Sequence, residues 1–290
     1  MHEIVSRYIL SRDIKATSAE QLEYALASFG KFLKVEPTAA HFSDDNVNRY
    51  LLWLAGEGFA HDTIKSRRRA LLTLWRSLVE DDRAAPPRKV RRLAPRTYIP
   101  RAWTPDQIAA ILGECEALSG TFRRRPDIQR RDYAVAICRT FYESGFRRSD
   151  VLRIRRPQIQ PSGLIVLVQS KTGVPHKARI RPQTIEAIDR MGTSGRETVF
   201  GGVVCTRWLS DFLKGVFQRA GIEEGSLKWF RRSGCTHVER ERPDEGWKFL
   251  GHTTPRVAKQ SYIDPTQLDT GAIMPPDPPH IDRRRPPGQD

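Results

Sequence analysis

Five side chains in the C-terminal two-thirds of the chain could together carry out one reaction on a phosphodiester. They are Arg147, Lys171, Arg231, His252 and Tyr262. Two guanidinium groups can hold phosphate oxygens, because each presents a planar fork of donors and stays charged at any working pH. A tyrosine hydroxyl can attack the phosphorus covalently, and an ammonium group and an imidazole can move protons. These residue types, in this order, favour metal-free attack of a tyrosine on a DNA phosphodiester.

Each of these residues has a distinctive local sequence. Arg147 lies in ESGFRRSD, Lys171 in SKTG, Arg231 in FRRS and His252 in LGH, and Tyr262 follows His252 by ten positions. The arrangement resembles the tyrosine recombinase, or phage integrase, family of the short two-domain type, over about residues 15 to 270. Alone, each residue would be explained as a surface arginine, a hairpin turn, a helix cap or a half-buried aromatic. Their joint occurrence in order favours the family.

The resemblance implies a role for each residue. Arg147 and Arg231 would hold the scissile phosphate, and Tyr262 would attack it to leave a phosphotyrosine at the 3′ end. Lys171 would give a proton to the leaving 5′-oxygen as general acid, and His252 would hydrogen-bond a phosphate oxygen or move a proton. The phosphotyrosine conserves the bond energy, so rejoining would need neither ATP nor a metal. We therefore expect no cofactor.

One position departs from the family pattern. The family usually has a histidine three residues before its second arginine, where this chain has Lys228. A lysine can donate to a phosphate but cannot accept a proton once it is charged. We keep Lys228 as a site residue. The substitution nevertheless leaves a second hypothesis open, a catalytically silent DNA-binding protein with an architectural or regulatory function on the same fold.

Two further classes have less support. Metal-dependent transposases use clustered carboxylates, whereas Asp132, Asp150 and Asp211 are scattered along the chain. RNA-recognition domains carry an aromatic-glycine strand motif, which this sequence lacks. The four cysteines stand singly, with no paired spacing for zinc or redox chemistry.

The charge of the chain indicates a polyanionic partner. The formal net charge is +15, which favours double-stranded DNA in this context. Residues 1–85 balance 12 Lys/Arg against 12 Asp/Glu, while the remaining 205 residues hold 37 against 22. We expect the phosphate-facing surface mainly in that second part. The sequence shows no signal peptide and no run near the ~18 apolar residues of a membrane span, so we expect a cytoplasmic, nucleoid-associated protein.

The sequence predicts a mainly α fold with a small β-sheet, and its elements must position these residues. Helical spacing of apolar residues predicts an all-helical domain over residues 1–85, which the family resemblance implies is a core-binding domain. Residues 86–101 contain six basic residues, four prolines and no acid, which is typical of a linker that crosses a DNA backbone. An α+β catalytic domain is expected over 102–273, and a disordered Pro/Arg-rich tail over 274–290.

Within the catalytic part, three elements are expected to present the site. A helix over 132–147 should deliver Arg147 in its last turn. A strand over 164–168 should turn at Lys171 and return through 178–180, so that the lysine lies on a mobile hairpin tip. A short helix over 257–263 should carry Tyr262.

Contacts to DNA outside the catalytic centre are predicted for two basic groups, one on the third N-terminal helix and one in the linker. They are Lys65, Arg69 and Arg76, and Arg88, Lys89, Arg91 and Arg92. The family resemblance implies a homo-tetramer on DNA with two protomers per site, an accessory factor as a further partner, and a C-terminal segment that docks on a neighbouring protomer. Among integration, excision and dimer resolution, we favour integration of a mobile element.

Overall fold

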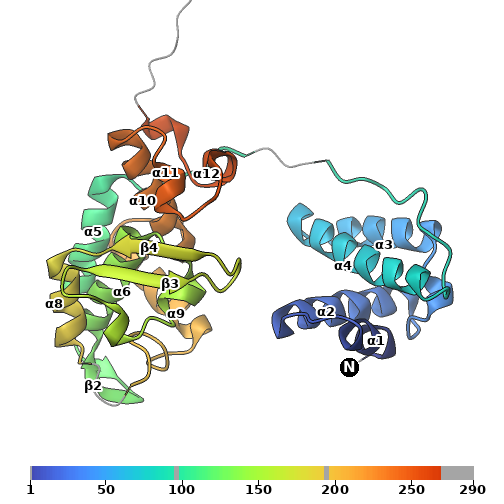
Figure 1. The fold of residues 1–290 in the computed structure, drawn as a ribbon, viewed down its shortest axis with the longest axis horizontal. Helices are drawn as coiled ribbons and strands as arrows, with labels where there is room; N and C mark the ends of the chain where they lie inside the picture. Colours follow the sequence, from blue (N-terminus) through green and yellow to red (C-terminus); the bar gives the residue numbers. More distant parts are fainter. Residues whose placement is uncertain (1, 95–97, 193–195, 269–290) are drawn as a thin grey trace, which may run out of the picture. The chain divides into compact units, whose positions relative to one another are not determined.

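A computed structural model describes residues 2–94, 98–192 and 196–268 of the chain (Figure 1). These residues form two compact units that divide near residue 97, here called unit 1 (2–94) and unit 2 (98–268). The fold is mainly helical with small antiparallel sheets, as the sequence predicted. The predicted tail, 274–290, lies outside the described residues.

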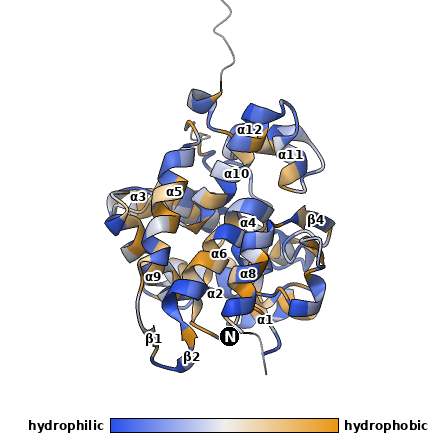
Figure 2. Cartoon of the chain, turned by 90° about the vertical axis from the view of Figure 1, so that its left-hand side faces the viewer, coloured by the Kyte–Doolittle hydropathy of each residue, from blue (hydrophilic) through white to orange (hydrophobic). Residues whose placement is uncertain are grey.

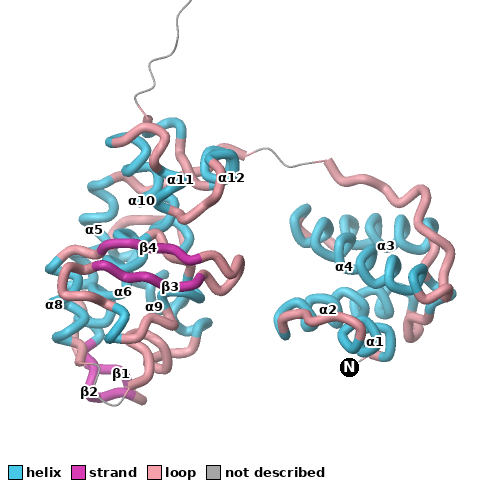
Figure 3. Tube along the Cα trace, viewed as in Figure 1, coloured by secondary structure: helices cyan, strands magenta, loops and turns pink. Residues whose placement is uncertain are grey.

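All regular structure in the described part of unit 1 is helical (Figure 3). Its elements are α1 (Glu3–Leu10), α2 (Ala16–Leu33), the 3₁₀ turn η1 (Ala39–His41), α3 (Asp44–Gly56) and α4 (His61–Glu80). Aromatic rings form much of the core, with Phe29 packed edge-on against Tyr50 at 5.3 Å between ring centroids. The helices carry hydrophobic residues between hydrophilic ones (Figure 2), because each buries one face only.

The first part of the predicted linker, residues 86–93, packs against unit 1. Val90 and Leu93 pack against the core of unit 1, and the Trp75 indole N–H donates to the Ala85 carbonyl at 2.7 Å. Residues 86–93 therefore lie against the helices. The sequence did not predict the packing of Val90 and Leu93, because two isolated apolar residues among prolines and arginines give no periodic signal.

Unit 2 combines helices with two small hairpins. Its elements are α5 (Pro105–Glu116), β1 (Thr121–Phe122), β2 (Arg125–Gln129), α6 (Arg130–Ser144), α7 (Arg148–Val151), η2 (Arg156–Gln158), β3 (Leu164–Val168), β4 (Pro175–Arg179), α8 (Pro182–Arg190), α9 (Thr206–Arg219), α10 (Leu227–Glu241), α11 (Gly246–Phe249), α12 (Pro255–Ser261) and η3 (Pro265–Gln267). β1 pairs with β2, and β3 with β4, both antiparallel.

α6 is the central helix of unit 2. Most of its residues are buried, and it packs against α5, α8, α10 and β4. Trp103 joins this core to α10: its ring meets Phe230 edge-on at 5.0 Å, and its backbone N–H donates to Ser233 Oγ at 2.9 Å. The helix that carries Lys228 and Arg231 is thereby fixed to the rest of the unit.

Three predicted element boundaries need correction. α6 ends at Ser144, not at 147, because Gly145 caps it with φ +60°, a conformation that favours glycine. β4 begins at Pro175, three residues before the predicted return strand. The helix near the C-terminal end runs from Pro255 to Ser261 and not from 257 to 263, because proline's fixed φ suits the first helical turn. Tyr262 is consequently its C-cap.

Candidate active site

Four segments of unit 2 bring five of the six predicted site residues together. α10, α11 and α12 gather at one end of unit 2 (Figure 1). Lys228 and Arg231 lie on the first turns of α10, His252 follows α11, and Tyr262 caps α12. Arg147 is the N-cap of α7, three residues beyond the end of α6.

Arg231 is a buried cation held by main-chain carbonyls. Its side chain is 3 % exposed, and its guanidinium donates to the carbonyl of Gly145 and, at 3.0 Å, to that of Leu250. No carboxylate forms an ion pair with it in the part of the chain that the structure describes. Burial lowers the pKa of Arg231 to about 10, a shift opposed by Tyr262 and reinforced by Arg147. The group stays protonated at neutral pH and lacks a counter-ion, so it suits an anionic ligand.

Arg147 reaches the same region through Gln169. Its Nη1 donates to Gln169 Oε1, and Gln169 is 1 % exposed at the end of β3. The amide nitrogen of Gln169 donates to the carbonyls of Leu250 and Gly251, each at 3.4 Å. One buried amide therefore connects the first arginine to the turn that carries His252. Sequence reasoning missed Gln169, because a single glutamine after a strand has no pattern.

His252 lies directly after a turn that only glycine fits. Gly251 has φ +63°, and a Cβ there would meet Gln169 Nε2 and the His176 ring at 2.6 Å. His252 Nε2 lies 3.3 Å from Nη2 of Arg231, and the arginine N–H must be the donor, which leaves the proton on Nδ1. Burial, then Arg231 and Arg147, lower the pKa of His252 to about 4. The imidazole is neutral at physiological pH.

His176 is a second imidazole under this turn. It lies on β4, is 5 % exposed, and packs edge-on against Phe146 at 5.0 Å. Burial, followed by the charge of Arg231, lowers the pKa of His176 to about 4. The alternation of β4 could have indicated an inward side chain at this position, but nothing in the sequence placed it beside His252.

Tyr262 is half-buried, with charged groups around its ring. The ring centroid lies 5.2 Å from Arg231 Cζ and 5.5 Å from Lys228 Nζ. The His252 ring meets it edge-on at 5.4 Å. The structure thus places Lys228, the residue that departs from the family pattern, beside the tyrosine.

The backbone of Tyr262 is fixed from α10. Its carbonyl accepts from Thr236 Oγ1 at 3.3 Å, and the preceding carbonyl, of Ser261, accepts from Arg232 Nε at 3.2 Å. Arg232, next to Arg231 but pointing elsewhere on the helix, therefore holds the end of α12 in place.

Lys171 is exposed on the β3–β4 loop, apart from the other five residues. No hydrogen bond or ion pair joins its ammonium group to a described residue. The base of the loop is anchored by Asp150, which is 1 % exposed and accepts from the backbone N–H and the hydroxyl of Ser170 at 2.8 and 2.6 Å. The loop is also held by Gln169, which accepts from the Thr172 hydroxyl at 3.0 Å and from the Gly173 backbone N–H at 2.9 Å. Asp150, classed from sequence as one of three scattered acids, lies three residues after Arg147 and links α7 to the hairpin.

Known proteins match this chain by fold and not by sequence. No protein-family model matches the chain, and no curated protein matches it by sequence. Solved structures do match. A lambda integrase (75–356) dimer bound to a COC′ core site is 17 % identical, covers 91 % of this chain and 96 % of its own, and has a TM-score of 0.71. The chain has the tyrosine recombinase fold.

Two further structures with this fold match at similar levels. XerH site-specific recombinase bound to palindromic difH substrate is 14 % identical, with 87 % and 78 % of the two chains covered and a TM-score of 0.67. The Tn1549 transposon integrase (82–397) in complex with circular intermediate DNA is 14 % identical, with 89 % and 94 % covered and a TM-score of 0.66. At this identity the likeness concerns the fold, and the chemistry depends on the side chains described above.

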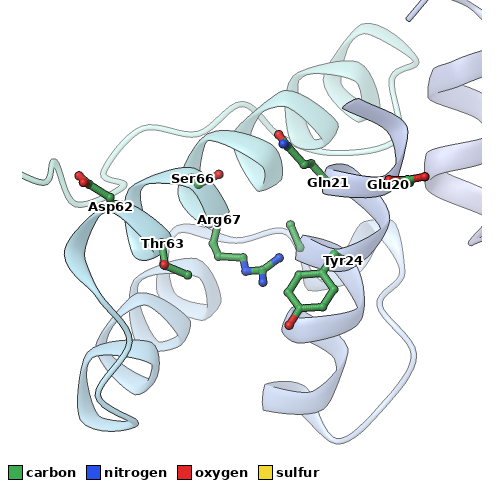
Figure 4. A pocket seen from close by; sticks show the side chains of 8 residues that line it. Glu20, Gln21, Tyr24, Asp62, Thr63, Ser66 and Arg67 are labelled. Atoms are coloured by element: carbon green, nitrogen blue, oxygen red, sulfur yellow. The ribbon is translucent and has the colours of Figure 1, made fainter. Parts of the chain in front are cut away.

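The basic residues of α4 have two different environments. Arg69 and Arg76 are exposed and Lys65 is half-buried, on the polar face of the helix. Arg67 turns away from them into the cleft between α2 and α4, where its Cζ lies 3.8 Å from the Tyr24 ring centroid (Figure 4). Arg67 therefore contributes to helix packing by a cation–π contact.

The described residues form neither a metal site nor a membrane span. Within residues 2–94, 98–192 and 196–268, no group of three or more His, Cys, Asp or Glu side chains is arranged to hold a metal ion. Nor does any helix in these ranges have the length and apolar character needed to cross a membrane.

Proposed function

We propose that this chain is an active site-specific recombinase that cleaves and rejoins duplex DNA through a 3′-phosphotyrosine at Tyr262, without metal or ATP. The observation that carries the proposal is Arg231. It is a buried cation with no ion-pair partner in the described chain, and its guanidinium carbon lies 5.2 Å from the ring of Tyr262. A phosphate bound there would supply the missing negative charge next to the nucleophile.

The two arginines would hold the scissile phosphate. Arg231 is preorganised by main-chain carbonyls and Arg147 by Gln169, so neither has to reorganise as charge accumulates on the non-bridging oxygens. Fixed donors of this kind, shielded from water, stabilise a transition state more than mobile ones. Lys228, near the tyrosine ring, would add a third positive charge.

The proton transfers follow from the protonation states of the site. The Tyr262 oxygen forms a bond to phosphorus as the bond to the 5′-oxygen breaks. The neutral His252 can accept the phenolic proton at Nε2 once a bound phosphate accepts the Arg231 hydrogen bond in place of this nitrogen, and the Lys171 ammonium gives a proton to the departing 5′-oxygen. A 5′-hydroxyl from a second strand reverses these steps, so the joint is restored without an energy source.

The DNA partner and the assembly follow from the same chemistry. Exchange between two duplexes requires four cleaved strands, and we propose two protomers per site in a homo-tetramer. A lambda integrase tetramer bound to a Holliday junction, 16 % identical with a TM-score of 0.72, supports this arrangement. We further propose that Lys65, Arg69 and Arg76 contact DNA phosphates, that an accessory factor assists, and that the reaction serves integration of a mobile element.

Covalent trapping tests the proposed chemistry. The preferred DNA is selected, nicked near its site and incubated with the protein in EDTA, and the adduct is mapped by mass spectrometry. We expect a phosphotyrosine at Tyr262, because the nick lets the cleaved fragment diffuse away. Tyr262→Phe should bind the same DNA with unchanged affinity and form no adduct. An adduct on another residue would overturn the assignment of the nucleophile.

The substitution at Lys228 favours one second candidate, a catalytically silent protein that binds or bends DNA. A charged lysine cannot serve as the proton acceptor that a histidine provides there. Tight binding by the unmodified protein with no adduct at Tyr262 in the same trapping experiment would support this candidate over the recombinase.

A further inference from the structure

Residues 86–93, here called the strap, are held against unit 1 in an extended course without helix or strand. The strap contains four basic residues and no acid. Its apolar residues Val90 and Leu93 are half-buried against the core of unit 1, while the four basic side chains are exposed. These four are Arg88, Lys89, Arg91 and Arg92.

Two polar side chains of α3 hold the backbone of the strap. The Asp44 carboxylate accepts from the backbone N–H of Arg88 at 3.2 Å and from that of Lys89 at 3.0 Å. One turn later, Asn48 accepts from the backbone N–H of Arg91 at 2.7 Å and donates to the Lys89 carbonyl at 3.0 Å. Four backbone groups are thus held by two side chains on one helix face. The strap needs such partners, because it belongs to no helix or sheet that would satisfy its backbone N–H and carbonyl groups.

A side chain of α4 also holds the strap. Arg68 Nε donates to the Arg91 carbonyl at 2.7 Å. Burial lowers the pKa of Arg68, and the charges of Arg76 and Arg92 lower it further. Cations of the helix and of the strap therefore lie close enough to repel one another, and a polyanion laid across them would relieve that repulsion.

We propose that Asp44 and Asn48 are positioning residues for DNA binding, and that they hold the strap so that its four cations extend the basic face of α4. This inference rests on the proposed function, since it names how the recombinase places part of its phosphate-binding surface. Residues 1–85 carry no net charge. The strap therefore supplies excess positive charge that the helices lack, and its position decides where on unit 1 a DNA backbone is attracted.

Substitution of two adjacent acids tests the proposal, because it predicts opposite changes in affinity for DNA. Asp44 and Asp45 both lie in the first turn of α3, so each contributes equally to the helix dipole and to the net charge. Asp45 is exposed, and among the described residues its carboxylate pairs only with Arg49, at 3.6 Å. If general electrostatics governed binding, removal of either acid would strengthen affinity for DNA. The hold of Asp44 and Asn48 on the strap, here called the clamp, predicts instead that Asp44→Ala weakens affinity for DNA.

The measurement is fluorescence anisotropy of the full chain with a short labelled duplex of random sequence, over a series of salt concentrations. For Asp44→Ala we expect affinity about three- to tenfold lower, with a slope of log K against log salt smaller by about 1 to 3, because phosphate contacts are lost. Asp45→Ala should bind as tightly as the unmodified chain or more tightly. Asp44→Asn keeps one acceptor oxygen and should recover part of the affinity, and Asn48→Ala should resemble Asp44→Ala.

Limited trypsin digestion provides a readout that needs no DNA. Cleavage after Lys89, Arg91 and Arg92, followed by mass spectrometry, should be several-fold faster in Asp44→Ala than in Asp45→Ala. Equal cleavage of the two variants, or equal or tighter DNA binding by Asp44→Ala, would overturn the clamp. A chain that binds DNA with the predicted sign but forms no adduct at Tyr262 would leave the clamp standing and remove the recombinase chemistry, so the two failures are distinguishable.

Discussion

At the scale of single residues, the site depends on a cation that the protein buries without neutralising it. Arg231→Ala should lower the rate of strand cleavage about 10²- to 10³-fold, the cost of removing one preorganised donor, or about 3–4 kcal/mol. Single-turnover cleavage of a nicked duplex measures this rate, and DNA affinity should change little in comparison. Arg148→Ala, an exposed arginine beside Arg147, is the matched control. Near-normal cleavage by Arg231→Ala would exclude the phosphate-holding role.

The two buried imidazoles make the stability of the fold depend on pH. Folding lowers the pKa values of His252 and His176 from 6.5 to about 4, so between these values the unfolded chain binds protons that the folded chain does not. The free energy of unfolding should therefore fall as the pH drops from about 6.5 towards 4. Urea denaturation at several pH values measures it. His176→Gln should reduce this dependence, and an unchanged profile would contradict the assignment.

The sequence pointed to candidate site residues that the structure brings together, and it missed side chains that hold them in place. Arg147, Arg231, His252 and Tyr262 were recognisable from their neighbours in the chain. Gln169 and His176 were not, because each acts through contacts that exist only after the hairpin folds against the turn at Gly251.

At the scale of elements, the exposed Lys171 lies on a hairpin loop that Asp150 and Gln169 hold by hydrogen bonds to Ser170 and Thr172. Lys171→Ala should lose cleavage of a normal strand but recover it on a 5′-bridging phosphorothiolate, whose sulfur leaves without a proton. Asp150→Ala removes the acceptor for the Ser170 backbone and hydroxyl, so it should show a weaker form of the same defect with the same rescue. Cleavage assays on the two substrates measure this. A defect in Asp150→Ala that the sulfur substrate does not rescue would indicate damage beyond the hairpin.

Element boundaries were harder to predict than elements. The helix before Arg147, the short helix near Tyr262 and the β3–β4 strand pair followed from the sequence pattern, but their ends depended on single residues. Gly145 ends α6, and a Cβ on it would come within 2.5 Å of the Phe249 ring. That close approach joins two segments about a hundred positions apart, so the sequence near Gly145 could not show it.

At the scale of the whole molecule, each protomer supplies one complete set of the six predicted site residues, five around α10–α12 and Lys171 on its hairpin. The structure divides the chain into two units near residue 97, and it packs Val90 and Leu93 of the strap against unit 1, a tertiary contact that no sequence pattern indicates. Under the proposed function, a single set would cleave one strand and rejoin the same strand. Recombination needs a second duplex, so under the proposed function the tetramer would be required by the chemistry and not only by affinity.

Mixtures of active and inactive protomers should reveal this requirement. Tyr262→Phe protomers should assemble normally, since the ring and its contacts are kept, yet each leaves one strand uncut. If all four protomers must cleave, an equal mixture should yield only about one-sixteenth of the recombinant product, because assembly of identical subunits is random. Adduct formation on a nicked single site should fall only by half in the same mixture. Product that falls linearly with the active fraction would show that protomers act independently and would remove the tetramer from the proposal.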